Sequence, residues 1–224
     1  MNEPDVMVYL MTGFLDSGKT QFLTFTLKQD YFQIDGKTLL ILCEEGEEEY
    51  DPMEMLQYGV VIERVEDQED LTAEWLQEME QKHEPERVVV EYNGMWKVSD
   101  FENLNLPDGW GIEQKLTTVD ASTFQMYLTN LKPLFVEMVR GADLVLFNRC
   151  EDIKPLAGYR RSVKVVSPQA EVIFEDEQGE IENIFEDEVP YDLNAPVVEI
   201  AKEDYGIWYV DMMENPDRYR GKVV

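Results

Sequence analysis

Residues 6–20 of the chain read VMVYLMTGFLDSGKT, and this stretch decides the fold. Residues 6–12 are apolar and β-compatible, residues 13–20 follow the pattern G-x-x-x-x-G-K-T, and residues 20–28 read as a helix. In this pattern the glycines let backbone N–H groups surround phosphate oxygens, the lysine reaches the β- and γ-phosphates, and the threonine hydroxyl binds Mg²⁺. A strand, this loop and a helix in that order predict a nucleotide-binding P-loop.

Short apolar segments alternate with helical patterns as far as residue 175. Strands are expected at 38–43, 60–65, 87–91, 115–119, 144–147 and 171–174, and helices at 69–82, 122–139 and 155–166. This alternation favours a mostly parallel sheet with helices on both faces, the three-layer α/β fold of a P-loop NTPase. In such sheets ligands bind at the carboxyl ends of the strands.

The composition changes after residue 175. The next residues are mainly acidic and read as a linker, whereas the segment 197–210 carries enough apolar residues to dock against some other surface. We therefore expect a P-loop domain over 1–175 and a linker with a docking segment over 176–224. Residues 221–224 read either as the first strand of a further domain or as a frayed terminus.

The net charge of −29, from 48 acidic and 19 basic residues, bears on the partners. It disfavours nucleic acid and anionic membranes but suits metal ions, cationic proteins and an Mg²⁺-bound nucleotide; simple solubility is the alternative interpretation. Cys43 and Cys150 form no CxxC pair, which fits a reducing compartment, and we expect the cytoplasm. No apolar run approaches the roughly 18 residues that a membrane span requires.

Further chemistry is expected at polar residues near the loop and at a strand end. Glu91 ends the strand at 87–91 and is placed to hold Mg²⁺ or its waters, and Gly94 can approach the γ-phosphate through its backbone N–H. Asp16 stands in the loop, where a carboxylate near phosphates is unfavourable, so it either orients a water or faces solvent. His83, the single histidine, is expected to end a helix rather than bind a ligand.

The loop GFLDSGKT at residues 13–20 resembles the G-F-L-G-A-G-K-T loop of CobW-like GTPases, relatives of the UreG and HypB metallochaperones. Residues 43–51, CEEGEEEYD, are similar to the family's N-E-F-G-E-x-x-x-D switch segment, and residues 91–94, EYNG, resemble its E-x-S-G segment. The resemblance implies a SIMIBI-type GTPase fold in which Asp51 and Glu91 serve the metal–nucleotide complex.

Three later segments continue the resemblance, which spans roughly residues 6–175. They are VDA at 119–121 for V-D-A, NRCE at 148–151 for the base-reading N-K-x-D, and SPQA at 167–170 for N-P-x-A. The resemblance implies that Asn148, Arg149 and Glu151 contact guanine. Glu151 is one methylene longer than the family's aspartate, which leaves guanine selectivity open. Arg149 either lies over the base or is a surface arginine.

The family's C-x-C-C metal motif is missing, since residues 63–67 read ERVED where it is expected. Thiolates select zinc and other soft ions, whereas carboxylates prefer harder ones, so a role in zinc delivery is put in doubt. Glu63, Glu66 and Asp67 form either a carboxylate metal site or a solvated loop before a helix.

These patterns predict a switch in which Mg²⁺·GTP orders the segments near Asp51 and Gly94, and GTP hydrolysis to GDP releases them. The output is metal handling or activation of a metalloprotein client, and the resemblance also implies pairing as a homodimer. The predicted catalytic residues are Lys19, Asp51 and Glu91; the nucleotide-binding residues are Gly13, Asp16, Ser17, Gly18, Lys19, Thr20, Gly94, Asn148, Arg149 and Glu151; the Mg²⁺ ligands are Thr20, Asp51 and Glu91.

Two other interpretations of the sequence stay open. The altered base motif and the missing cysteines also fit a nucleotide-binding interaction module without turnover, which contacts a cationic or metalloprotein partner. An ATP-dependent P-loop protein such as a kinase is the third interpretation, because the fold alone does not fix the function.

Overall fold

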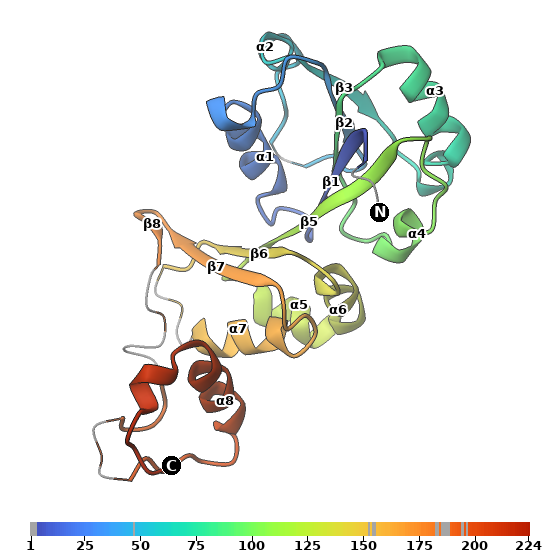
Figure 1. Ribbon diagram of the computed structural model, residues 1–224. Coiled ribbons are helices and arrows are strands. Elements are labelled where there is room, and N and C mark those ends of the chain that lie inside the picture. Colours follow the sequence, from blue (N-terminus) through green and yellow to red (C-terminus); the bar gives the residue numbers. More distant parts are fainter. Residues whose placement is uncertain are drawn as a thin grey trace.

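The computed structural model of the protein describes residues 4–46, 48–151, 153, 156–181, 184, 189–193, 195 and 197–224. Within these residues the strands form an eight-stranded sheet of order β3-β2-β4-β1-β5-β6-β7-β8 (Figure 1). All described pairs are parallel except β7 with β8. The strands are β1 Val6–Thr12, β2 Thr38–Leu42, β3 Val60–Arg64, β4 Arg87–Glu91, β5 Trp110–Asp120, β6 Leu144–Asn148, β7 Glu171–Asp176 and β8 Gly179–Glu180.

Helices connect the parallel strands up to β7, and one more helix follows β8. They are α1 Lys19–Leu27, α2 Pro52–Gln57, α3 Ala73–His83, α4 Val98–Glu102, α5 Phe124–Asn130, α6 Lys132–Val139, α7 Leu156–Lys164 and α8 Tyr205–Glu214, with short 3-10 turns at Asp30–Phe32, Gln68–Asp70 and Pro216–Tyr219. None of the helices in the described part of the chain combines the length and the apolar character of a membrane span.

The sheet is buried on both faces, which β2 shows residue by residue. Leu39 and Ile41 belong to the cluster that includes side chains of α3 to α7, whereas Leu40 and Leu42 belong to the cluster formed with α1 and α2. Successive side chains of a strand point to opposite faces, so the continuous apolar run of β2 needs a helix layer on each side. The predicted three-layer α/β fold is confirmed.

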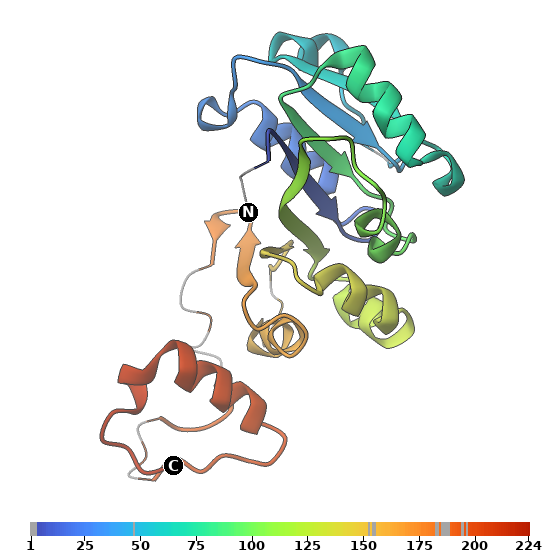
Figure 2. The ribbon, with the colours of Figure 1, turned by 45° about the vertical axis from the view of Figure 1, so that its right-hand side comes forward.

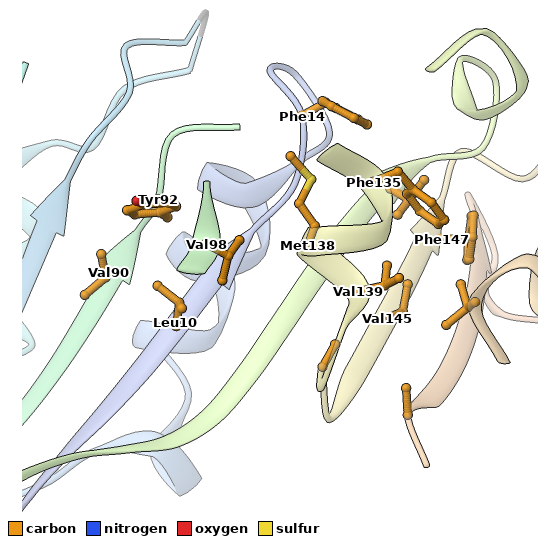
Figure 3. Packing of buried hydrophobic residues seen from close by; sticks show 14 of the residues in the cluster. Leu10, Phe14, Val90, Tyr92, Val98, Phe135, Met138, Val139, Val145 and Phe147 are labelled. Carbon is orange, nitrogen blue, oxygen red and sulfur yellow. The ribbon is translucent and has the colours of Figure 1, made fainter. Parts of the chain in front are cut away.

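An aromatic group fills the layer between α5, α6, α7 and the strands β6 and β7. Phe124 packs edge-on against Phe135 and Phe147, with centroid distances of 5.2 and 5.1 Å, and Phe147 stacks on Phe174. Figure 3 shows Phe14, at the tip of the loop after β1, on the same side as Phe135 and Met138. The phosphate loop is therefore packed directly onto the core.

Several element boundaries differ from those expected. The helix predicted at 122–139 is two helices, α5 and α6, which meet at Leu131. Pro133 lies in the first turn of α6, where its missing N–H cannot continue the hydrogen bonds of the preceding helix. The predicted helix at 69–82 starts later, at Ala73, because the side chain of Thr72 accepts a hydrogen bond from the Trp75 N–H and caps it.

The predicted linker starts with ordered structure. β7 continues to Asp176 and turns through Gly179, whose φ of 120° favours glycine, into the antiparallel β8. Pro155 and residues 182, 183 and 185–188 of the predicted linker lie outside the described residues.

The C-terminal segment lies beside α7 (Figures 1 and 2). Ile207 of α8 is buried, and Glu214 forms ion pairs with Arg160 and Lys164 of α7 at 2.7 and 3.2 Å. The chain end, for which a first strand and a frayed terminus were the two interpretations, contributes one isolated parallel bridge between Val197 and Val223.

Candidate functional site

The loop after β1 has a backbone that requires its glycines. Gly13 has a φ of 146°, and a Cβ atom there would lie 2.5 Å from both the Thr118 carbonyl oxygen and the Ser17 hydroxyl. Gly18 has a φ of 89° and directly precedes α1, and a Cβ atom there would lie 2.6 Å from Asn148 Nδ2, so a side chain at this position would crowd the start of the helix. This is the geometry in which a helix N-terminus receives phosphate oxygens.

Lys19 is buried at the base of this loop and its side chain folds back over it. The ammonium donates to the carbonyl oxygens of Gly13 and Phe14, each at 2.9 Å, and forms an ion pair of 2.5 Å with the Glu44 carboxylate. The two carbonyls fix the position of the charge, while the third contact is made to an anionic group. An ammonium held in this way is preorganised to bind an anion.

Ser17 and Asp16 take different places in the loop. The Ser17 side chain is buried behind the loop, where its hydroxyl shares a hydrogen bond of 2.9 Å with Thr118 of β5. Asp16 is exposed and has a φ of 58°. The resembling loops have glycine at this position, and aspartate is one of the few other residues that tolerate this conformation. Of the two expectations for Asp16, that it orients a water or that it faces solvent, the structure agrees with the second.

Thr20 and Glu91, predicted as Mg²⁺ ligands, lie together. The Thr20 hydroxyl donates to Glu91 Oε1 at 2.7 Å, and the hydroxyl of Tyr50 donates to Oε2 at 2.5 Å. Burial raises the pKa of Glu91, although hydrogen bonds from the two hydroxyls and the charge of Lys19 oppose this. A hydroxyl and a carboxylate side by side offer the hard oxygen ligands that Mg²⁺ prefers, so the residues present fit this ion.

Tyr50 was missed from the sequence, because a tyrosine in an acidic run carries no metal or nucleotide signal. We expect Tyr50→Phe to lower the free energy of unfolding by about 2 kcal/mol, since the variant removes one hydrogen bond to a buried carboxylate. Urea unfolding followed by circular dichroism measures this. Tyr58→Phe is the matched control, because Tyr58 is only half-buried at the end of α2. Equal urea midpoints for the two variants would contradict the assigned bond.

Asp51 is the one predicted Mg²⁺ ligand that the structure does not bring to Thr20. Its Oδ1 accepts hydrogen bonds from the N–H groups of Met53 and Glu54, at 2.9 and 3.2 Å, and so caps α2. The side chain is exposed, and the residues that line the cavity of about 80 Å³ over Lys19 and Thr20 do not include it.

Gly94 follows β4 and lies against the phosphate loop. Its N–H donates to Glu44 Oε1 at 3.2 Å, and a Cβ atom at this position would lie 2.4 Å from the Gly13 carbonyl oxygen. Glu44 therefore joins Lys19 and Gly94 through its two carboxylate oxygens. Sequence reasoning gave Glu44 no role of its own, because it begins a run of acidic residues that reads as a solvated loop.

The base-reading segment lies at the other end of the loop. Asn148 donates from Nδ2 to the Ser17 carbonyl oxygen at 2.8 Å, and its Oδ1 is buried without a hydrogen-bond partner among the described residues. The Glu151 carboxylate accepts from the N–H of Glu177 at 2.8 Å, which ties it to the β7–β8 turn. A groove of about 1010 Å³ runs from Gly18 and Asn148 to this turn, which is ample for a base and ribose.

Arg149 is fixed across the phosphate loop. Its guanidinium donates to the Asp16 carbonyl oxygen at 2.8 Å and to Asp120 Oδ2 at 2.6 Å. Partial burial raises the pKa of Asp120, but hydrogen bonds from Ser122 and Arg149 outweigh it and hold that pKa below its ordinary value. Asp120, at the end of β5, was noted in the sequence only as part of the VDA segment. Its ion pair with Arg149 could not be predicted, because it depends on how the two segments fold around the phosphate loop.

Residues 63–67 stand where the C-x-C-C motif was expected, and Glu63 among them pairs with side chains at a helix end. Glu63 accepts hydrogen bonds from Lys82 and His83, each at 2.7 Å, which places the single histidine in a pair at a helix end. Among the described residues, no group of three or more His, Cys, Asp or Glu side chains is arranged to hold a metal ion. Both cysteines are buried and free, and burial raises the thiol pKa of each, that of Cys150 to about 12.

Comparisons with known proteins agree with this arrangement. The CobW/HypB/UreG nucleotide-binding domain matches residues 7–174. The hydrogenase maturation factor HypB from Archaeoglobus fulgidus is similar in structure, with a TM-score of 0.52 and 17% identity over 78% of this chain and 83% of that one. The Zn(II)-bound YjiA GTPase from E. coli gives a TM-score of 0.57 and 22% identity over 82% of this chain, and the match spans 60% of that protein.

A third structure, HypB from Helicobacter pylori in complex with nickel, gives a TM-score of 0.50 and 10% identity over 98% of this chain and 90% of that one. At these identities the structures establish the fold alone. A search of curated proteins found no significant match.

Proposed function

The chain belongs to the CobW/HypB/UreG family of nucleotide-binding domains, and from this premise we propose that it binds GTP and GDP with Mg²⁺ and hydrolyses GTP. The observation that carries the proposal is the loop after β1. Its lysine is held by two loop carbonyls at 2.9 Å, its two glycines with positive φ shape the backbone before α1, and a threonine–carboxylate pair lies beside it. These are the parts that a phosphoanhydride with a hard cation requires.

In this proposal each part of the loop has one task. Lys19 and the backbone amides between Gly13 and Thr20, including those of Asp16 and Ser17, hold the phosphate chain and stabilise charge that develops on it during hydrolysis. Thr20 and Glu91 hold Mg²⁺ directly or through water, and this ion, when bound, offsets the charge of the phosphates. Asp51 can join them only after a rearrangement of the segment before α2, because its Oδ1 caps that helix.

The base would lie in the groove beside Asn148, with Arg149 supporting the loop and Glu151 accepting from the guanine N–H groups. The buried and unpaired Asn148 Oδ1 supports this placement, since a buried acceptor without a partner is unfavourable until a donor reaches it. To bind the base, the Glu151 carboxylate would have to give up the hydrogen bond that it accepts from the Glu177 N–H.

We further propose that the nucleotide switch acts in metal handling or in the activation of a metalloprotein client in the cytoplasm. The similar YjiA structure is bound to Zn(II), and that of Helicobacter pylori HypB is in complex with nickel. The net charge of −29 suits a cationic partner, and a homodimer is the proposed assembly. We propose no transition-metal site on this chain, since the described residues include no group of three or more His, Cys, Asp or Glu side chains that could hold such an ion.

Isothermal titration with GTP, GDP and ATP in the presence of Mg²⁺, followed by a phosphate-release assay, tests the function. We expect the guanine nucleotides to bind more tightly than ATP. Glu151→Gln should weaken GTP binding about tenfold and leave ATP binding unchanged, because it replaces one charge-assisted hydrogen bond worth about 1.4 kcal/mol.

Glu177→Gln is the control for that variant. It removes a charge from the same turn and keeps the backbone N–H that donates a hydrogen bond to Glu151. GTP binding without phosphate release would favour an interaction module over a GTPase. Equal affinity for ATP and GTP, unchanged by Glu151→Gln, would reject the guanine assignment.

A further inference from the structure

We propose that Glu44 sets the discrimination between nucleoside triphosphate and diphosphate at this site, because its carboxylate takes the two donors that a γ-phosphate would use. The inference rests on the proposed function and adds to it a residue that decides which nucleotide state is favoured. Its basis is the contact geometry of Glu44, Lys19 and Gly94.

Both oxygens of the Glu44 carboxylate are engaged. Oε2 lies 2.5 Å from Lys19 Nζ, and Oε1 accepts from the Gly94 N–H at 3.2 Å. The Glu44 side chain is 9% exposed and that of Lys19 is 3% exposed, so the pair lies inside the protein rather than on a solvated surface. A planar anion with two acceptor oxygens therefore bridges the phosphate loop and the segment after β4.

The backbone next to Glu44 is anchored to the same strand end. The Cys43 N–H donates to the Glu91 carbonyl oxygen at 2.9 Å, and Asn93 Nδ2 donates to the Cys43 carbonyl oxygen at 3.1 Å. These bonds hold the main chain one residue before Glu44 and leave its side-chain torsions as the route by which the carboxylate can leave. The carboxylate is thus delivered to a fixed place and can be displaced by rotation.

The cavity over the loop shows what this placement excludes. It measures about 80 Å³ and is lined by Lys19, Thr20, Glu44 and Glu91 among others. Small-molecule sites generally measure hundreds of Å³. A third phosphate at Lys19 and Gly94 would meet the Glu44 carboxylate, and two anions in contact at a partly buried site repel each other strongly.

The two nucleotides therefore differ in what they demand of Glu44. A triphosphate must expel the carboxylate and take over both of its donors. A diphosphate has no γ-phosphate, so Glu44 can keep the Gly94 N–H and remain near Lys19. The wild-type chain is expected to favour GDP, and the return of Glu44 after phosphate release favours the diphosphate state again.

Titrations with GDP and with a non-hydrolysable GTP analogue, both with Mg²⁺, test this in the full chain. For Glu44→Gln, which keeps the size of the side chain and removes its charge, we expect the ratio of the dissociation constants for the analogue and for GDP to fall about tenfold or more. Glu44→Ala should change the ratio in the same direction. Glu45→Gln, an equal loss of charge on the exposed neighbour, should leave the ratio within about twofold.

The outcomes separate this inference from the proposed function. Tight binding of both nucleotides by the wild type, with a ratio that neither Glu44 variant moves, overturns the role of Glu44 alone. Binding of the analogue by the Glu44 variants but not by the wild type supports it. No binding of any guanine nucleotide by any variant overturns the proposed function together with this inference.

Discussion

Lys19→Ala is expected to weaken the binding of GTP and GDP by about 100-fold or more. The ammonium is the buried cation of the phosphate loop, and it is fixed by the Gly13 and Phe14 carbonyl oxygens before any ligand arrives. A charge-assisted hydrogen bond contributes about 1.5–3 kcal/mol, and the proposed role gives Lys19 contacts to two phosphates. Isothermal titration with Mg²⁺ measures the loss.

The same substitution also acts on the free protein. It leaves the Glu44 carboxylate without its cation in a place where the side chain is only 9% exposed, so stability should fall as well. The double variant Lys19→Ala/Glu44→Gln removes the uncompensated charge. We expect it to recover much of the lost thermal stability while its nucleotide binding stays weak.

This pair of variants separates a folding effect from a binding effect. If Lys19→Ala bound GTP within about threefold of the wild type, the loop would not be the nucleotide site. If the double variant regained GDP binding along with stability, the role of Lys19 would be structural rather than a direct contact to phosphate.

Much of the site could be predicted because its chemistry is local. The glycines at 13 and 18 are required by backbone conformations with positive φ, and a lysine and a threonine directly after the second glycine are typical of a phosphate-binding loop. Thr20 and Glu91 were both predicted as Mg²⁺ ligands, and they meet because β1 and β4 are neighbouring parallel strands whose carboxyl ends share one edge of the sheet.

The remainder depends on contacts between segments far apart in the chain. Glu44 reads as one of several solvated acids, and only the fold brings it to Lys19 and Gly94. Asp51 follows the family pattern, yet a local alternative, capping of α2, is available to any aspartate before a helix. Glu151 contacts the turn of the β7–β8 hairpin. This hairpin was not predicted, because the acidic composition of residues 175–180 reads as a linker.

Gly94→Ala is the second variant for which we expect a large effect. The added methyl group would lie 2.4 Å from the Gly13 carbonyl oxygen and 2.8 Å from Phe14 Cα, which are backbone atoms of the phosphate loop. Either that loop or the segment after β4 must move, and the Gly13 carbonyl that positions Lys19 moves with it. We expect GTP and GDP to bind at least about 30-fold more weakly and stability to fall by about 1–3 kcal/mol.

Gly158→Ala is the matched control, because a Cβ atom at that position in α7 has no atom of the described residues outside its own helix backbone within 4 Å. It should bind nucleotide as the wild type does and gain about 0.5–1 kcal/mol, as alanine does over glycine inside a helix. Titration and thermal unfolding of the two variants give a direct comparison. Wild-type affinity in Gly94→Ala would mean that the segment after β4 does not support the phosphate loop. The contacts of Glu44 with Lys19 and Gly94 would then have no bearing on nucleotide binding.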